Sequence, residues 1–159
     1  VVGVDFSEAM LQVARAKRAA RGERGVALLA ADALALPFAD ATFACVTSAF
    51  LLRNLADLPR GLSEMRRVTV RGGLVAALEI TRPRVPGWDA LFGLYFGRLV
   101  PLVGAVVARD RAAYTYLPRS VERFVAPAEL AELMRGAGLR DVRWRRLGLG
   151  TIALHVGRV

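Results

Sequence analysis

The sequence contains one cysteine, one histidine and one lysine, and each scarcity excludes a class of protein. A single cysteine cannot form an internal disulfide, so we expect a reducing compartment. Cys45 and His155 are too few to form a metal-ligand cluster, and we predict no metal site. Lysine occurs only at Lys17, so 22 of the 23 basic residues are arginine, a bias that we attribute to the codon usage of a GC-rich genome.

Acidic residues are also outnumbered, which gives the chain a formal net charge of +9. The basic residues are scattered, and only the stretch RWRR, Arg143 to Arg146, is dense. A scattered positive charge favours association with anionic surfaces but does not form the stripe typical of nucleic-acid binding. We therefore expect no nucleic-acid partner. Together with the reducing compartment, this favours a cytoplasmic location with peripheral contact at the inner face of the cell membrane. Nothing in the sequence predicts an oligomeric state.

The hydrophobic pattern of the first 50 residues alternates between strand and helix. The run VVGVD is almost continuously apolar, which predicts a parallel strand covered on both faces. Ser7 and Glu8 then begin a predicted helix. Its expected apolar face comprises Met10, Leu11, Val13 and Ala14. The segments VALLAAD and FACVTSAF repeat the strand pattern, with the loop LPFADATF leading into the second of them.

The rest of the chain continues the alternation. Leu58, Leu62, Met65 and Val68 recur at helical spacing, and RGGLVAALEI turns through a glycine pair into a fourth strand. A helix over PAELAELMRGAGL, ending at two glycines, precedes RDVRWRRLG and TIALHVGRV, which we interpret as an antiparallel hairpin at the sheet edge. The pattern predicts a single α/β domain over residues 1–159 with a largely parallel sheet and a C-terminal antiparallel hairpin.

One connection, over residues 86–117, is unusually long and apolar. We interpret it as a helical lid that takes a lipophilic tail and touches the membrane surface. A plain core helix and a transmembrane helix are the alternatives. Asp89, Arg98 and Pro101 count against the transmembrane alternative.

Acidic residues stand where two predicted strands end. In open α/β sheets, ligands bind beyond the carboxyl ends of the strands. Asp5 can accept hydrogen bonds from both hydroxyls of a ribose, and Asp32 can accept from the exocyclic amino group of adenine. Asp5 alone also fits an NAD site or a helix cap, and Asp32 also fits a solvated turn.

In these motifs the sequence resembles the ubiquinone/menaquinone biosynthesis C-methyltransferases, which are class I S-adenosylmethionine-dependent methyltransferases. The resemblance covers nearly the whole chain, in the family's order and spacing. The segments that carry it are VVGVDFSEAML, AADALALPF, FLLRNLADLPRGLSEMRRV, GGLVAALE, YTYLPRSVERF and ALHVG.

The resemblance implies a Rossmann-like fold, S-adenosylmethionine as the cofactor, and a set of cofactor-binding positions. Asp5 with Phe6 corresponds to the ribose contact, Asp32 with Ala33 to the adenine contact, and Ala49 to a contact at the end of the third strand. Leu51 stands where the family usually has glycine. In the family a further strand and a glycine-rich turn precede the segment that begins here. That strand normally lies between the strand that ends at Asp5 and the strand that ends at Ala49. We therefore expect an N-terminally truncated domain that is inactive by itself.

The resemblance also implies a lipophilic quinol substrate and a set of residues facing it. Methyl transfer to a ring carbon is helped by deprotonation of a ring hydroxyl, and a guanidinium can stabilise the resulting phenolate. Arg53 is our candidate for that role, and Asn54 could orient the same hydroxyl. The alternative for Arg53 is a structural salt bridge. Phe92, Tyr114 and Tyr116 are expected near the ring.

His155 is a candidate general base because its usual pKa suits neutral pH, with a hydrogen-bonded packing residue as the alternative. The leading functional hypothesis is C-methylation of a demethylmenaquinol or a ubiquinone precursor. The alternatives are a class I methyltransferase for another small hydrophobic acceptor and a non-catalytic Rossmann-like binding module.

Overall fold

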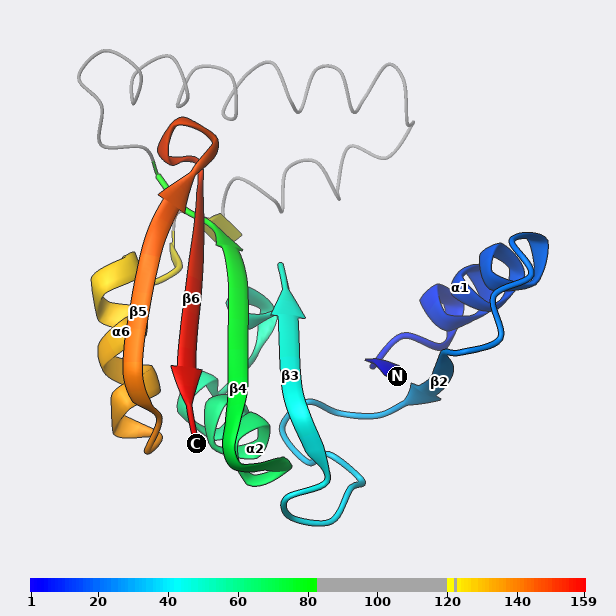
Figure 1. Ribbon diagram of the computed structural model, residues 1–159. Coiled ribbons are helices and arrows are strands. Elements are labelled where there is room, and N and C mark those ends of the chain that lie inside the picture. The colour runs from blue at the N-terminus through cyan, green and yellow to red at the C-terminus, as the bar shows by residue number, and fades with distance from the viewer. Residues whose placement is uncertain (83–119, 122) are drawn as a thin grey trace, which may run out of the picture.

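The computed structural model describes residues 1–82, 120–121 and 123–159, which form an α/β structure with two sheets (Figure 1). A two-stranded sheet comprises β1 (Val2–Asp5) and β2 (Ala27–Ala30), and a four-stranded sheet has the order β3-β4-β6-β5. Figure 1 shows β1, β2 and helix α1 (Glu8–Ala20) standing apart from the larger sheet. The two strands between which the resemblance expects another strand, β1 and β3, thus belong to different sheets.

The N-terminal unit forms as its sequence predicts. Strands β1 and β2 are parallel, with Asp5 paired to Ala30. Ser7 caps α1, because its side-chain oxygen accepts a hydrogen bond from the backbone N–H of Met10 at 3.4 Å.

The expected burial of this unit is wrong. No residue of β1 is fully buried, and Val4 is 37% exposed. Leu11 is buried on α1, whereas Met10 and Val13 are 57% and 47% exposed. The physical reason is that β1 pairs only with β2, so the unit offers too little apolar surface to cover its own strand and helix.

The four-stranded sheet is mixed. Strand β4 pairs parallel with β3 and antiparallel with β6, which in turn pairs antiparallel with β5. The predicted C-terminal hairpin at the sheet edge is therefore confirmed. The bounds of these strands are Phe43–Ala49 for β3, Thr69–Ile80 for β4, Arg140–Leu147 for β5 and Ile152–Arg158 for β6. The 3₁₀ turn η4 (Gly148–Gly150) joins the two hairpin strands.

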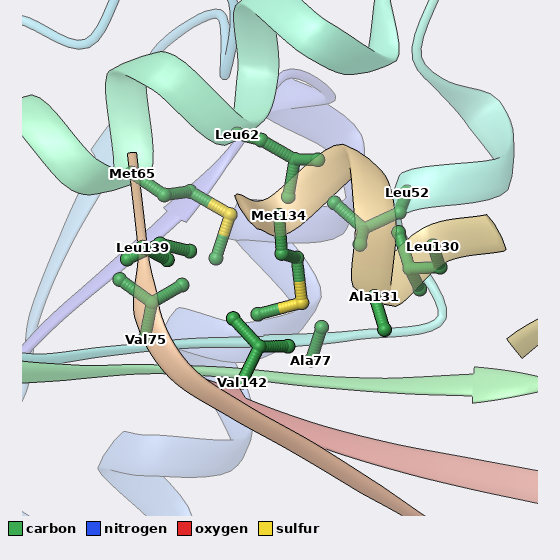
Figure 2. Packing of buried hydrophobic residues seen from close by; sticks show 10 residues of the cluster. All are labelled: Leu52, Leu62, Met65, Val75, Ala77, Leu130, Ala131, Met134, Leu139 and Val142. Atoms are coloured by element: carbon green, nitrogen blue, oxygen red, sulfur yellow. The ribbon is translucent and has the colours of Figure 1, made fainter. Parts of the chain in front are cut away.

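Helices α2 (Leu58–Arg67) and α6 (Pro127–Gly136) pack against one face of this sheet. The predicted helical spacing is confirmed, because Leu62 and Met65 of α2 are buried and meet Met134 of α6 over Val75 of β4 (Figure 2). Within the described residues no helix is long and apolar enough to cross a membrane.

The glycine pair before the predicted fourth strand lies inside β4 rather than before it. Gly72 has a φ of +78°, and the pairing with β3 shifts register between Phe43 and Cys45. The glycines therefore form an irregularity that lets one long strand bend, since a side chain at Gly72 would be strained.

Candidate active site

Asp5 and Asp32 lie at the same end of the two-stranded sheet. Asp5 is the last residue of β1, and Asp32 follows β2 by two residues. Because β1 and β2 are parallel, with Asp5 opposite Ala30, both carboxylates emerge at the carboxyl ends of neighbouring strands.

Each of these carboxylates is held by a short turn of its own. Oδ1 of Asp5 accepts the N–H of Ser7, and Oδ1 of Asp32 accepts the N–H of Leu34, both at 2.8 Å. Oδ2 of each makes no hydrogen bond to the described part of the chain. Two fixed, exposed carboxylates with a remaining acceptor atom fit the hydroxyl and amino donors of a nucleoside.

The other expected cofactor positions are divided between the two sheets. Phe6 follows Asp5 and is 82% exposed, and Ala33 follows Asp32 and is half-buried. Ala49 is exposed at the end of β3, in the four-stranded sheet. The structure thus brings four of the five positions to one edge and places the fifth at the corresponding end of a different strand.

The loop after Asp32 is fastened to α2 by an ion pair that the sequence did not reveal. Arg67 donates to the carbonyl oxygens of Leu36 and Phe38 and to both carboxylate oxygens of Glu64, at distances of 2.7–2.9 Å. Glu64 in turn accepts the N–H of Leu36 at 2.9 Å. The hydrogen bonds from Arg67 lower the pKa of Glu64. In return, the Glu64 carboxylate holds the pKa of Arg67 above its usual value.

Arg53 lies in η1 (Leu52–Asn54), directly after the end of β3, and forms a buried ion pair with Glu79. Its Nη1 lies 3.0 Å from Oε2 of Glu79, and the two side chains are 10% and 2% exposed. The other carboxylate oxygen, Oε1, accepts the N–H of Leu52 at 2.6 Å. Arg53 is therefore a salt-bridge partner, as the structural alternative predicts, and its partner is the acid near the end of β4.

The position of Glu79 follows from the alternation of side chains along β4. Val75, Ala77 and Glu79 share the buried face that packs on the helices, so the glutamate has to be buried too. Burial raises the pKa of the Glu79 carboxyl, and the hydrogen bond and charge of Arg53 oppose that shift without cancelling it. An acid in phase with buried apolar residues was the sequence signal for this site.

The carbonyl oxygen of Phe50 organises the same turn. Phe50 has a φ of +58°. Its carbonyl oxygen accepts from Nη1 of Arg53 at 2.7 Å and from Nδ2 of Asn54 at 3.4 Å. Arg53 and Asn54 thus converge on one backbone atom, which brings both predicted substrate-side residues together at the end of β3.

His155 lies on the same helix-covered face of the sheet as Glu79, opposite Ala77 in the pairing of β4 with β6. It is 1% exposed, and its Nε2 lies 2.8 Å from the carbonyl oxygen of Pro127 in α6. Its ring stacks on that of Trp144 with a centroid distance of 5.9 Å. This is the environment of a hydrogen-bonded packing residue, and burial lowers the pKa of its imidazole.

The residues expected to face the substrate ring, Phe92, Tyr114 and Tyr116, lie outside the described residues, as does the lid expected over 86–117. Within the ranges that the structure describes, no group of three or more His, Cys, Asp or Glu side chains could hold a metal ion.

Comparison with known sequences gives matches along the entire chain. The profile of the ubiE/COQ5 methyltransferase family matches residues 1–159. A demethylmenaquinone methyltransferase of Roseiflexus castenholzii is 47% identical over 156 residues, which are 98% of this chain and 64% of the relative. One of Thermus thermophilus is 45% identical over 99% of this chain and 70% of the relative. The chain therefore spans about two thirds of the length of these relatives.

Solved structures show the same fold at low identity. A methyltransferase of Thermotoga maritima described as S-adenosylmethionine-dependent superposes with a TM-score of 0.69 at 21% identity, over 98% of this chain and 72% of that one. A second methyltransferase described in the same way, from Aquifex aeolicus, superposes with a TM-score of 0.69 at 18% identity, over 100% of this chain and 69% of that one. The expected Rossmann-like methyltransferase fold is thereby confirmed.

Proposed function

The chain belongs to the ubiE/COQ5 methyltransferase family, and from that premise we propose that it is the greater part of a methyltransferase that uses S-adenosylmethionine to methylate a ring carbon of a demethylmenaquinol. We propose further that residues 1–159 belong to a single catalytic domain. The name shared by the relatives at 45–47% identity favours menaquinone over ubiquinone biosynthesis.

The residues at the strand ends fit the cofactor. Asp5 would hold the ribose hydroxyls and Asp32 the adenine amino group, because each carboxylate keeps one oxygen that is not used by its own turn. When bound, S-adenosylmethionine supplies an activated methyl group on a sulfonium. The protein's task is then mainly alignment, which contributes up to about 7–11 kcal/mol in well-oriented reactions.

Arg53 and Asn54 would act on the acceptor. A guanidinium close to a ring hydroxyl favours its ionised form, and the phenolate makes the adjacent ring carbon a better nucleophile. Bound S-adenosylmethionine would supply the methyl group to that ring carbon and would leave as S-adenosylhomocysteine, and the ring would then release its proton to solvent water. Asn54 lies one residue further along the same turn and would orient the hydroxyl.

The observation that carries this proposal is the common placement of Asp5 and Asp32 at the ends of two paired parallel strands. A methyltransferase that acts on another small hydrophobic acceptor would use the same cofactor site. Only a turnover assay with the quinol separates that alternative from the proposed function. Peripheral membrane contact stays a prediction, because the residues for which it was made lie outside the described part of the chain.

The test uses the intact gene product. Incubated with S-adenosylmethionine and a reduced demethylmenaquinone, it should yield the ring-methylated quinol and S-adenosylhomocysteine. Titration calorimetry with S-adenosylhomocysteine should show weaker binding for Asp5→Ala, while Glu23→Ala, which removes an exposed acid from the opposite end of the same unit, should bind normally. Absence of S-adenosylhomocysteine binding to the wild type would contradict the proposal and favour a binding module.

A further inference from the structure

We infer that Glu79 is a positioning residue for methyl transfer: its buried carboxylate locks the Arg53 guanidinium so that one edge of it faces the acceptor oxygen. This inference rests on the proposed function, because Arg53 is taken as the residue that stabilises the acceptor phenolate. Nothing in the chemistry requires Glu79 to touch the substrate.

Glu79 fixes two groups of the turn at once. One carboxylate oxygen accepts the N–H of Leu52, and the other accepts Nη1 of Arg53. Strand β4 is paired on both sides, with Glu79 opposite Ala153 of β6, so the carboxylate stands on a rigid element. A short turn held by a buried charge has less freedom than one held by backbone hydrogen bonds alone.

The way Arg53 is bound decides which of its donors remain. A guanidinium has five N–H donors in one plane. Nη1 donates to both Phe50 and Glu79, which occupies its two hydrogens. Nε is buried and has no hydrogen-bond partner in the described part of the chain. Nε and Nη2 are therefore the donors left for the acceptor oxygen, which would accept two converging hydrogen bonds from them once it displaces the atoms that now cover Nε.

A buried donor without a partner among the described residues is unusual enough to require a reason. Lysine at position 53 could satisfy the charge of Glu79 but could not offer a planar pair of donors. The geometry thus separates two tasks within one side chain: Nη1 anchors it to the fold, and the opposite edge faces the acceptor.

The experiment measures steady-state methyl transfer by the intact gene product and its Glu79→Gln, Arg53→Ala and Glu79→Gln/Arg53→Ala variants. Glutamine keeps the shape and an acceptor for Leu52 but removes the charge that holds Arg53. We expect Glu79→Gln to lower kcat about a hundredfold, the loss that a misplacement of about 1 Å can cause, with little change in KM or in the affinity for S-adenosylhomocysteine. In the Arg53→Ala background the same substitution should have no further effect. Glu132→Gln, which removes the carboxylate of an exposed ion pair on α6, is the matched control.

Four results would overturn the inference or its basis, and they are distinguishable. Wild-type turnover in Glu79→Gln, or an equal loss of kcat with and without Arg53, would show that Glu79 does not act through Arg53. If Glu79→Gln does not fold, the Arg53→Lys variant tests the inference instead. Lysine keeps a cation beside Glu79 but lacks the planar pair of donors, Nε and Nη2. A wild-type kcat in Arg53→Lys would show that these two donors play no role. A wild-type protein that binds the cofactor product but methylates no quinol would instead contradict the proposed function.

Discussion

Nε2 of His155 lies 2.8 Å from the carbonyl oxygen of Pro127, and this contact fixes the tautomer of the neutral ring. A carbonyl oxygen only accepts, so Nε2 carries the hydrogen, and in the neutral ring Nδ1 is then an unprotonated acceptor. Nδ1 is buried and has no partner among the residues described. Protonation at Nδ1 would place a charge where nothing described stabilises it.

We therefore predict that acidification destabilises the fold through His155. Burial lowers the pKa of this imidazole, so below the usual value of ~6.5 the unfolded chain binds a proton that the folded chain does not. The stabilisation is complete above ~6.5 and is lost as the pH falls from there towards the lowered pKa, with a limiting slope of about 1.4 kcal/mol per pH unit. Urea unfolding between neutral and mildly acidic pH measures it.

His155→Gln is the control for this prediction, because its amide can still donate to Pro127 but does not titrate. The variant should be less stable than the wild type at neutral pH and should lose less stability on acidification. Parallel pH profiles for the two proteins would show that another group is responsible.

Gly73 is packed so tightly that it tolerates no side chain. A Cβ there would lie 2.7 Å from the carbonyl oxygen of Ala44 and 2.8 Å from that of Val70. These contacts are with backbone, which cannot move aside without disturbing the pairing of β3 with β4. We expect Gly73→Ala to cost about 1–3 kcal/mol of unfolding free energy, as overpacking does in cores.

Gly136, the last residue of α6, is the matched comparison. A Cβ there would meet no described residue within 4 Å. Gly136→Ala should therefore raise the free energy of unfolding by about 0.4–1 kcal/mol, because alanine lowers the conformational entropy of the unfolded chain. The same chemical change should thus have opposite signs at the two sites in thermal unfolding. Equal effects would contradict the packing at Gly73.

The sequence pattern predicted where helices and strands form better than it predicted how deeply they are buried. The start of α1 at Ser7 and Glu8, the apolar spacing of α2, and the C-terminal hairpin are properties of short segments, and the structure confirms them. The burial of β1 and α1 depends on which other elements cover them. The spacing of apolar residues within a segment does not contain that information.

The site shows the same division. The placement of Asp5 and Asp32 at one edge of a sheet could be predicted, because the ends of the two strands are visible in the sequence. Glu79 could not be paired with Arg53, since the two are 26 residues apart and meet only when β4 lies beside β3. Arg67 was still harder to recognise, because its partners at Leu36 and Phe38 are backbone carbonyls, which any residue type provides.

The ion pair between Glu64 and Arg67 should protect the loop that follows Asp32. Glu64→Ala removes the acceptor for the N–H of Leu36 and both carboxylate contacts of Arg67, so hydrogen exchange at Leu36 should become about tenfold faster or more. Since Arg67 lowers the pKa of Glu64, the carboxylate stays charged below its usual ~4.3, and protection should persist until the pH falls through the lowered value.

Exchange measured by NMR at single amides checks this prediction. Glu132→Ala, which removes an exposed ion pair from α6, should leave the Leu36 amide unchanged. Unaltered protection of Leu36 in Glu64→Ala would mean that the loop is held by other contacts.

The final prediction separates the roles of the two strand-end acids. If Asp32 accepts a hydrogen bond from the adenine amino group, Asp32→Asn should weaken binding of S-adenosylhomocysteine about tenfold to a hundredfold, the range for hydrogen bonds to charged groups. The inosine analogue, S-inosylhomocysteine, presents a carbonyl at that position, which the Asp32 carboxylate repels and an asparagine amide can donate to. The preference for adenosine over inosine should therefore shrink or reverse in Asp32→Asn. Asp5→Asn should weaken both ligands alike, because the ribose is common to them. Titration calorimetry of the two ligands against the wild type and both variants measures the preference directly, and an equal loss for both ligands in Asp32→Asn would remove Asp32 from the adenine site while leaving the ribose assignment of Asp5 intact.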